Sequence, residues 1–234
     1  MKKISIATGI LITLLLAAVS SFAQTQSRED LLKQIEAKRT ELDALEKRFL
    51  SPSEEDKARY ADFLRQPNTG LIRLLPAEKK QLTMNGGGAF YSFVRLTHEY
   101  GQGSDIMLSQ GLLSSGFAGL DYGILTSLGD IPIENVSLEC AAAQVLAAHV
   151  PPTEQPVIRT EQRKWGNGET VEGSSYRSRV PVMVNSTYLL RAVSYERSDT
   201  LVALRVVRVD NDDSAIILWK LIKKFPTPLV ARNN

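Results

Sequence analysis

The sequence is poor in the residues from which metal sites and covalent active sites are usually built. Among 234 residues it has one cysteine, Cys140, and two histidines, His98 and His149. A single cysteine cannot form an intrachain disulfide, so stability in an oxidising compartment must come from a packed core. A zinc site would need both histidines together with carboxylates. The sequence therefore predicts no metal site and no cofactor.

The chain also lacks a surplus of charge. It contains 28 Lys+Arg against 26 Asp+Glu, and two of the lysines, Lys2 and Lys3, lie in an N-terminal segment that we expect to be removed. The remaining chain is balanced, which gives no electrostatic case for binding nucleic acid.

Several enzyme motifs are incomplete. The run "HEYGQ" begins like a zinc-protease helix, but Gln102 stands where the second histidine is required. Neither "NGGG" nor "GLLSSG" is followed by the Lys-Ser/Thr of a phosphate-binding loop, and no Gly-x-Ser-x-Gly elbow is present. The acidic run "DNDDS" has Ala215 and Leu221 where a calcium loop needs glycine and glutamate, which predicts a solvated hairpin turn.

Residues 1–23 have the features of an export signal. Lys2 and Lys3 precede an apolar run, and the small residues Ser21 and Ala23 predict cleavage before Gln24. The apolar run is shorter than the roughly 20 residues of a membrane-spanning helix and contains hydroxyl side chains. We therefore expect an exported protein, periplasmic or secreted, with no stable membrane span after cleavage. An N-terminal anchor that is kept is the alternative.

Residues 24–66 are predicted to form a helical arm. Ser27 and Asp30 resemble a capping box at the start of a helix over 27–49. Its apolar residues recur at three- and four-residue steps, as in a short coiled coil; they are Leu31, Ile35, Leu42, Leu45 and Phe49. Arg28 and Lys38 interrupt this seam. Two alternatives stay open: the helix packs on its own domain, or it self-associates.

A second helix is expected after the break at Pro52. Ser53 and Asp56 repeat the spacing of the first cap, and the helix should end before Pro67.

Residues 67–234 read as a mainly antiparallel, β-rich domain, so the predicted fold class is α+β: a curved sheet, sandwich or partial barrel with helices packed against it. Alternating apolar residues predict strands over 89–100, 105–117 and 120–128, the second with a glycine break at Gly111. The chain closes in a predicted three-stranded meander, "STYLLRAVSY", "TLVALRVVRV" and "AIILWKLIKKF", joined by short polar turns.

Two further segments interrupt the predicted strands. The alanine-rich run near 138–149 is apolar almost all round, which predicts a short buried helix. Residues 151–179 are rich in polar residues, proline and glycine, and we expect a long loop or a loose hairpin there.

The stretch "NGGGAFYSFVRLTHEYGQGSD", residues 85–105, holds the candidate functional residues. Carboxylates beside a histidine can support acid–base chemistry, so the catalytic candidates are His98, Glu99 and Asp105. Aromatic and charged side chains nearby could bind a ligand; these candidates are Arg95, Tyr100, Asp121 and Tyr122. The alternative is a strand between two glycine turns, with charges paired across the sheet.

Three hypotheses for function follow. The first is an exported, non-enzymatic binding or scaffold protein that can self-associate through the 27–49 helix. The second is an exported hydrolase acting on glycan or another envelope polymer through the 95–105 cluster. The third is a carrier of lipid or another hydrophobic ligand, because several strands have apolar residues on both faces.

Overall fold

The computed structural model describes residues 27–98, 100–101 and 103–231. The chain separates into two units, one ending at Leu45 and one beginning at Glu46. The predicted signal peptide, residues 1–23, and its cleavage site lie outside the described residues. No helix within the described part of the chain is both long enough and apolar enough to cross a membrane.

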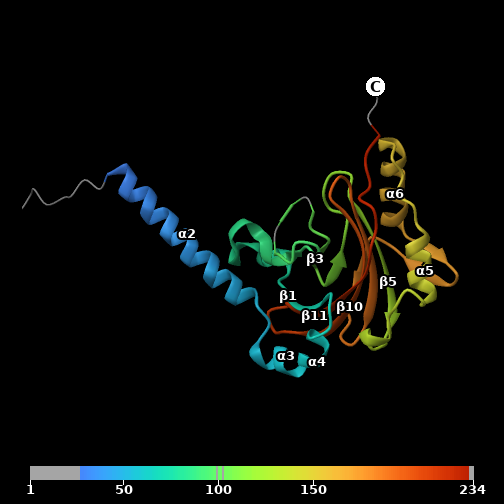
Figure 1. Ribbon diagram of the computed structural model, residues 1–234, viewed down its shortest axis with the longest axis horizontal. Coiled ribbons are helices and arrows are strands. Elements are labelled where there is room, and N and C mark those ends of the chain that lie inside the picture. Colours follow the sequence, from blue (N-terminus) through green and yellow to red (C-terminus); the bar gives the residue numbers. More distant parts are fainter. Residues whose placement is uncertain (1–26, 99, 102, 232–234) are drawn as a thin grey trace, which may run out of the picture. The chain divides into compact units, whose positions relative to one another are not determined.

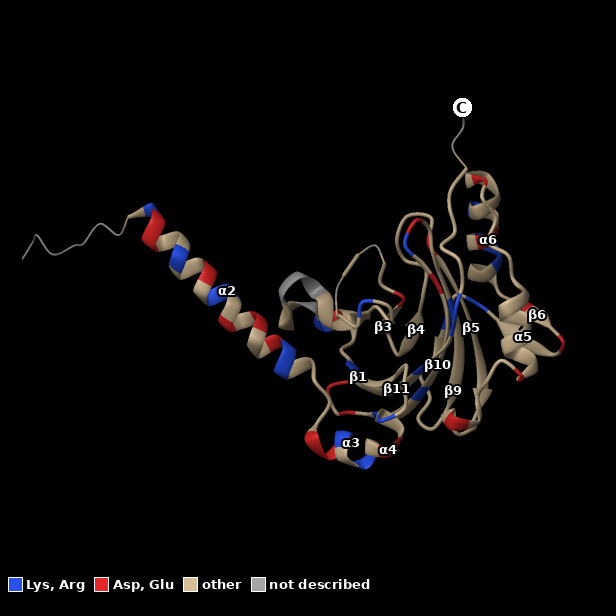
Figure 2. Cartoon of the chain, viewed as in Figure 1, with Lys and Arg blue, Asp and Glu red and all other residues tan. Residues whose placement is uncertain are grey.

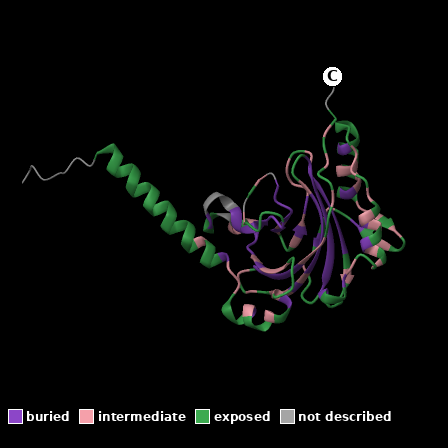
Figure 3. Cartoon of the chain, in the orientation of Figure 1, coloured by how far each residue is buried: buried purple, intermediate pink, exposed green. Residues whose placement is uncertain are grey.

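The first long helix is α2, Arg28–Leu50. Its predicted cap is confirmed: the Asp30 backbone N–H donates to Ser27 Oγ at 3.1 Å, and Ser27 Oγ donates to Asp30 Oδ2 at 2.8 Å. Glu29 and Asp30 lie in the first turn and Lys47 and Arg48 in the last, which is the favourable arrangement for the helix dipole. Leu50 is the one buried residue of α2 (Figure 3).

The second predicted helix forms as two short pieces, α3 (Glu54–Arg59) and α4 (Ala61–Leu64). The expected cap is present, because the Asp56 N–H donates to Ser53 Oγ at 3.1 Å. The helix breaks at Tyr60, whose φ of −105° departs from helical values.

The domain after Leu64 is built on two antiparallel sheets, which confirms the α+β class (Figure 1). The larger sheet has the strand order β1-β11-β10-β9-β5. Its strands are β1 (Thr69–Leu74), β5 (Tyr122–Gly129), β9 (Thr187–Ser194), β10 (Ser198–Val209) and β11 (Ala215–Lys224). The predicted closing meander is therefore correct.

The smaller sheet has the order β2-β3-β4-β8. Its strands are β2 (Phe90–Tyr91), β3 (Ile106–Ser109), β4 (Leu112–Ser114) and β8 (Arg179–Pro181). Between β1 and β2 the chain forms two 3-10 helices, η1 (Ala77–Leu82) and η2 (Met84–Ala89). The strand predicted over 105–117 forms as two, β3 and β4, divided at the predicted break at Gly111. Gln110 (φ +50°) and Gly111 (φ +70°) both adopt positive φ, which closes a tight hairpin.

The larger sheet is buried on both faces. One core lies between the two sheets and includes Leu190 and Val202; the other includes Leu189 and Leu201, from the opposite face of β9 and β10. This second core is covered by α5 (Ala141–Ala148), α6 (Gln155–Asn167) and the hairpin of β6 (Glu169–Val171) with β7 (Ser174–Tyr176). In Figure 1, α5 and α6 lie on the side of the large sheet away from β3.

Segment 151–179, predicted as a long loop or a loose hairpin, does contain a hairpin, β6–β7, but helix α6 takes the place of the loop before it. Ile158 and Trp165 are seven residues apart and both buried, so they anchor one face of α6 against the sheet. Gly168, with φ +90°, ends the helix. The expected helix near 138–149 is α5, but only Ala143 and Leu146 are buried, so it is half-exposed rather than enclosed.

The segment after β11 runs back across the ends of other elements. The Phe225 N–H donates to the Asp199 carbonyl, the Glu196 N–H to the Pro228 carbonyl, and the Ala231 N–H to the Thr153 carbonyl, each at 2.8 Å. These bonds hold residues 225–231 over the junction of β9 and β10.

Candidate functional site

The predicted strand over 89–100 ends after Tyr91. Beyond it the chain makes a tight turn: the Leu96 N–H donates to the Ser92 carbonyl at 2.8 Å, and the Ser92 N–H donates to the Thr97 carbonyl at 3.0 Å. Leu96 has φ +56°, which a branched residue in a strand does not adopt. The turn forms because side chains capture backbone N–H groups that a strand would have used for its ladder.

Asp105 is the side chain that fixes this turn. Its Oδ2 accepts the Phe93 N–H at 2.7 Å, and it is 1% exposed. Burial raises the pKa of Asp105 to about 6, against the opposing effect of hydrogen bonds from Phe93 and Ser92. Oδ1 has no hydrogen-bond partner among the described residues. Asp105 is therefore a buried carboxyl that can gain or lose a proton near neutral pH.

Asp121 lies close enough to act on Asp105, because its charge contributes to the raised pKa of Asp105. Its own carboxylate accepts the Ser194 hydroxyl at 2.7 Å and the Tyr195 N–H at 3.1 Å. Burial raises the pKa of Asp121 as well. Both carboxyls are thus buried groups with raised pKa values, and they lie on either side of the β3–β4 hairpin in the sequence.

Two arginines border this carboxyl pair. A methyl group placed on Gly103 (φ +88°) would lie 3.2 Å from Arg197 Cδ and 3.4 Å from Arg95 Nη2, so both side chains flank the loop. The charge of Arg95 lowers the pKa of Asp105, and the charge of Arg197 lowers the pKa of Asp121. The charges of the cluster are therefore mixed rather than purely acidic.

His98 is not arranged as a general base for Asp105. Its ring packs edge-on against Tyr91, with centroids 5.1 Å apart, and Nδ1 has no hydrogen-bond partner among the described residues. Burial lowers the pKa of His98 to about 4, so the ring is neutral at pH 7. Tyr100 is 65% exposed and stacks edge-on with Phe90 at 4.8 Å. Glu99, the remaining catalytic candidate, lies outside the described residues.

Tyr122 belongs to a different cluster from its neighbour Asp121, because adjacent strand residues point to opposite faces. Its hydroxyl lies 2.7 Å from His149 Nε2, and the His149 ring packs edge-on against Trp165 at 5.8 Å. Burial lowers the pKa of His149 to about 4. The two histidines therefore belong to opposite faces of the large sheet and cannot share a metal ion.

No group of three or more His, Cys, Asp or Glu side chains in the described part of the chain is placed to hold a metal ion.

Sequence reasoning missed a buried ion pair between β9 and β10. Arg191 and Asp199 both have side chains 1% exposed, and Arg191 Nη2 donates to Asp199 Oδ2 at 2.7 Å while Nε contacts Oδ1. Arg191 Nη1 donates to the Leu146 carbonyl at 2.8 Å, and the Phe225 ring covers the guanidinium at 3.2 Å. Nothing in the local sequence distinguishes these two charges from exposed ones.

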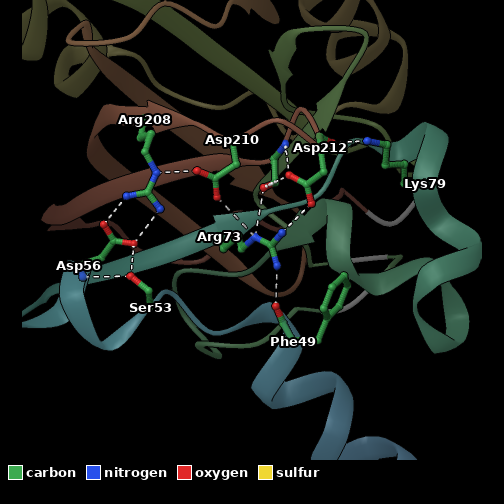
Figure 4. A network of polar contacts seen from close by, with 9 residues as sticks. Phe49, Ser53, Asp56, Arg73, Lys79, Arg208, Asp210 and Asp212 are labelled. Carbon is green, nitrogen blue, oxygen red and sulfur yellow. Dashed lines mark hydrogen bonds and ion pairs between the residues drawn. The ribbon is translucent and has the colours of Figure 1, made fainter.

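A second polar network explains the acidic turn "DNDDS" (Figure 4). Arg208 pairs with Asp56 and Asp210, and its Nη2 lies 2.8 Å from Asp56 Oδ2. Arg73 donates to Asp212 at 2.6 Å and to the Phe49 carbonyl at 2.7 Å. The turn between β10 and β11 was predicted, but it is not simply solvated: Asp210 and Asp212 pair with arginines, and Asp213 lies 3.6 Å from Lys79 while staying exposed. This network is structural.

The apolar seam of α2 is partly exposed along its length. The five seam side chains are between 41% and 50% exposed; they are Leu31, Ile35, Leu42, Leu45 and Phe49. Basic and acidic residues are interspersed along the helix (Figure 2). Lys38, inside the seam, pairs with Glu41 of the same helix at 2.7 Å.

Comparison with known proteins identifies no relative: no family model matches the chain, and neither does any curated protein or solved structure.

Proposed function

We propose that this chain is an exported, non-enzymatic binding or scaffold protein of the cell envelope or extracellular space, and that it self-associates through α2. The observation that carries the proposal is the seam of five half-exposed apolar side chains along one helix. Exposed apolar surface of this extent on a soluble protein is characteristic of an interaction site. The features of residues 1–23 support export.

The free energy gained by covering the seam side chains fits a reversible association. Fully burying a Leu, Ile or Phe side chain contributes about 1.5–3 kcal/mol, so covering the exposed half of one contributes about 1 kcal/mol. A pair of helices would cover ten such side chains, or about 10 kcal/mol, against an association cost of about 4–15 kcal/mol. The oligomer should therefore dissociate on dilution.

A partner would also stabilise the helix itself. Isolated helices are marginal in water, and most helical stability in proteins comes from packing of an apolar face. None of Arg28 to Phe49 is buried, so a second helix packed on the seam would supply that contribution.

The test is the mass in solution of the chain from Gln24 onward. We expect an oligomer that becomes monomeric in Leu42→Glu, since the new charge lies in the seam. The matched control is Thr40→Glu, which adds the same charge at an exposed position outside the seam and should leave the mass unchanged. A wild-type monomer at all concentrations, or equal behaviour of the two variants, would reject the proposal.

A hydrolase acting on glycan is the second candidate, favoured by one observation. Asp105 combines a pKa near 6 with an unpartnered Oδ1, and the charge of a second carboxyl, Asp121, contributes to that raised pKa. A protonated carboxyl beside an ionised one is the minimum set for glycoside hydrolysis. Loss of glycan-cleaving activity in Asp105→Asn, without loss of folding, would establish this function; no activity in the wild type would end it.

We prefer the scaffold proposal because the polar contacts of both carboxyls fix the loop. Asp105 holds the turn at Phe93, and Asp121 holds Ser194 and Tyr195. The carrier hypothesis loses its motivation, since the apolar residues on both faces of β9 and β10 pack in two protein cores.

A further inference from the structure

We propose that a cleft between η1 and the two hairpin turns beside it binds a small organic cation, an apolar body that carries an ammonium group. The two turns are the one between β3 and β4 and the one between β10 and β11. The cleft has a volume of about 400 Å³, and its lining residues come from segments that lie far apart in the sequence. It lies outside α2, so this inference goes beyond the proposed self-association and does not depend on it.

Apolar side chains form much of the cleft. Pro76 and Leu108 line it and are buried. Val182 is half-buried there, and Val209 is 40% exposed. Small-molecule sites in proteins are concave and mostly apolar, with a few polar groups, and their volumes begin at about 300 Å³. The cleft therefore has the size and the lining to cover a short alkyl chain or a single ring.

The sides of the cleft are hairpin turns that η1 holds in place. Gln110 (φ +50°) closes the turn between β3 and β4, and Asp213 (φ +63°) lies in the turn between β10 and β11. Ser109 Oγ, beside the first turn, donates to Glu78 Oε1 at 2.6 Å. Lys79 Nζ lies 3.6 Å from Asp213 Oδ2 in the second turn. The cleft is therefore formed in the absence of a ligand, as is usual for small-molecule sites.

The charges that line the cleft favour a cation. They are those of Glu78, Lys79 and Asp213, so acids outnumber bases by two to one. The hydrogen bond from Ser109 lowers the pKa of Glu78, so this carboxylate is ionised at pH 7.

The one basic group of this lining is already engaged. The Lys79 ammonium donates to the Asp212 carbonyl and pairs with Asp213, and Figure 4 shows it directed at this turn. Asp213 keeps a side chain that is 80% exposed, so a ligand can approach its carboxylate from solvent. An ammonium group in the cleft would meet two carboxylates, whereas an anion would be repelled by them.

Three ligands with one alkyl chain test both the cleft and its preference for charge. Octylammonium, octanol and octanoate differ in their head groups, which are positive, neutral and negative. Each is titrated into the whole chain below the concentration at which it aggregates, and calorimetry gives the Kd. We expect octylammonium to bind with a Kd on the order of 1 mM, more tightly than octanol, and octanoate to bind most weakly.

Two lysine variants locate the binding. Val209→Lys places a charged side chain in the cleft and should weaken octylammonium and octanol at least about fivefold. The matched control is Val157→Lys, in α6 across the large sheet (Figure 1), where the replaced side chain is 43% exposed; it should leave both affinities unchanged. Equal effects of the two variants, or no binding of any of the three ligands, would overturn the cleft as a site.

Asp213→Asn tests the charge preference separately. Asparagine tolerates the positive φ of this position, so the turn should be kept. Because the carboxylate is exposed, we expect octylammonium binding to fall about two- to fivefold and octanol binding to stay the same. Octanoate binding as tightly as octylammonium to the wild type would overturn the cationic class of ligand, and so would an equal change for octylammonium and octanol in this variant.

Discussion

The ion pair of Arg191 and Asp199 gives the sharpest stability prediction. Both side chains are 1% exposed, so replacing Asp199 with asparagine leaves a guanidinium buried without its counter-charge. Removing one partner of a buried pair costs about 3–5 kcal/mol, whereas replacing both with apolar residues is often neutral. We therefore expect Asp199→Asn to be strongly destabilising.

The double variant Arg191→Met/Asp199→Leu supplies the comparison. It removes both charges but also the hydrogen bond from Arg191 to the Leu146 carbonyl, at 2.8 Å, and the contact with Phe225. An unsatisfied carbonyl costs about 1–3 kcal/mol. The double variant should therefore be less stable than the wild type but more stable than Asp199→Asn, by about 2 kcal/mol.

Urea unfolding measures both differences, provided that the slope of unfolding free energy against urea is unchanged. A loss of 3–5 kcal/mol corresponds to a fall in Tm of roughly 6–20 °C for a chain of this size. The reasoning is refuted if Asp199→Asn costs less than about 1 kcal/mol, because water would then reach the guanidinium. It is also refuted if the double variant is the less stable of the two.

Two further predictions concern Asp105 and the glycines. The folded pKa of Asp105, about 6, lies above its ordinary 3.8, so its contribution to stability should be lost as pH rises from about 4 to 6. At 1.36 kcal/mol per pKa unit the loss of unfolding free energy is roughly 3 kcal/mol. It should appear when the unfolding free energy of Asp105→Asn, from urea unfolding at each pH, is subtracted from that of the wild type. A difference that does not change with pH would contradict the assignment. A methyl group on Gly70 would lie 2.4 Å from Trp219 Nε1, whereas one on Gly166, in α6, meets nothing within 4 Å. Calorimetry should therefore show Gly70→Ala destabilised by about 1–3 kcal/mol and Gly166→Ala stabilised by about 0.5–1 kcal/mol, and equal signs would count against the packing.

Local patterns predicted the elements that depend on local physics. The caps at Ser27 and Ser53 formed as expected, because each needs only an N–H three residues later. The meander of β9, β10 and β11 also formed as expected, since short polar turns leave adjacent strands few alternatives.

The errors arose where distant side chains decide the backbone. Asp105 captures the Phe93 N–H and ends a stretch that alternates like a strand. The polar composition around α6 concealed Ile158 and Trp165, whose burial becomes visible only against the sheet.

The candidate site stays a prediction. Asp105 and Asp121 lie on either side of the β3–β4 hairpin, and the charge of Asp121 contributes to the raised pKa of Asp105. His98 and Tyr122 were grouped with them by proximity in sequence, but His98 packs on Tyr91 and Tyr122 points to the opposite core. The face of the sheet that a side chain occupies depends on the strand register, and a shift of one residue moves the side chain to the opposite face.

The pairing of β1 with β11 has a consequence for the synthesis of the protein. Leu74 pairs with Ala215, and Thr69 with Lys220, so β1 leaves the ribosome long before its neighbour exists. During that interval its backbone edge and the apolar Ile72 and Leu74 have no native cover. An open strand edge can pair with other chains, so a nascent chain held before β11 is made should depend on chaperones.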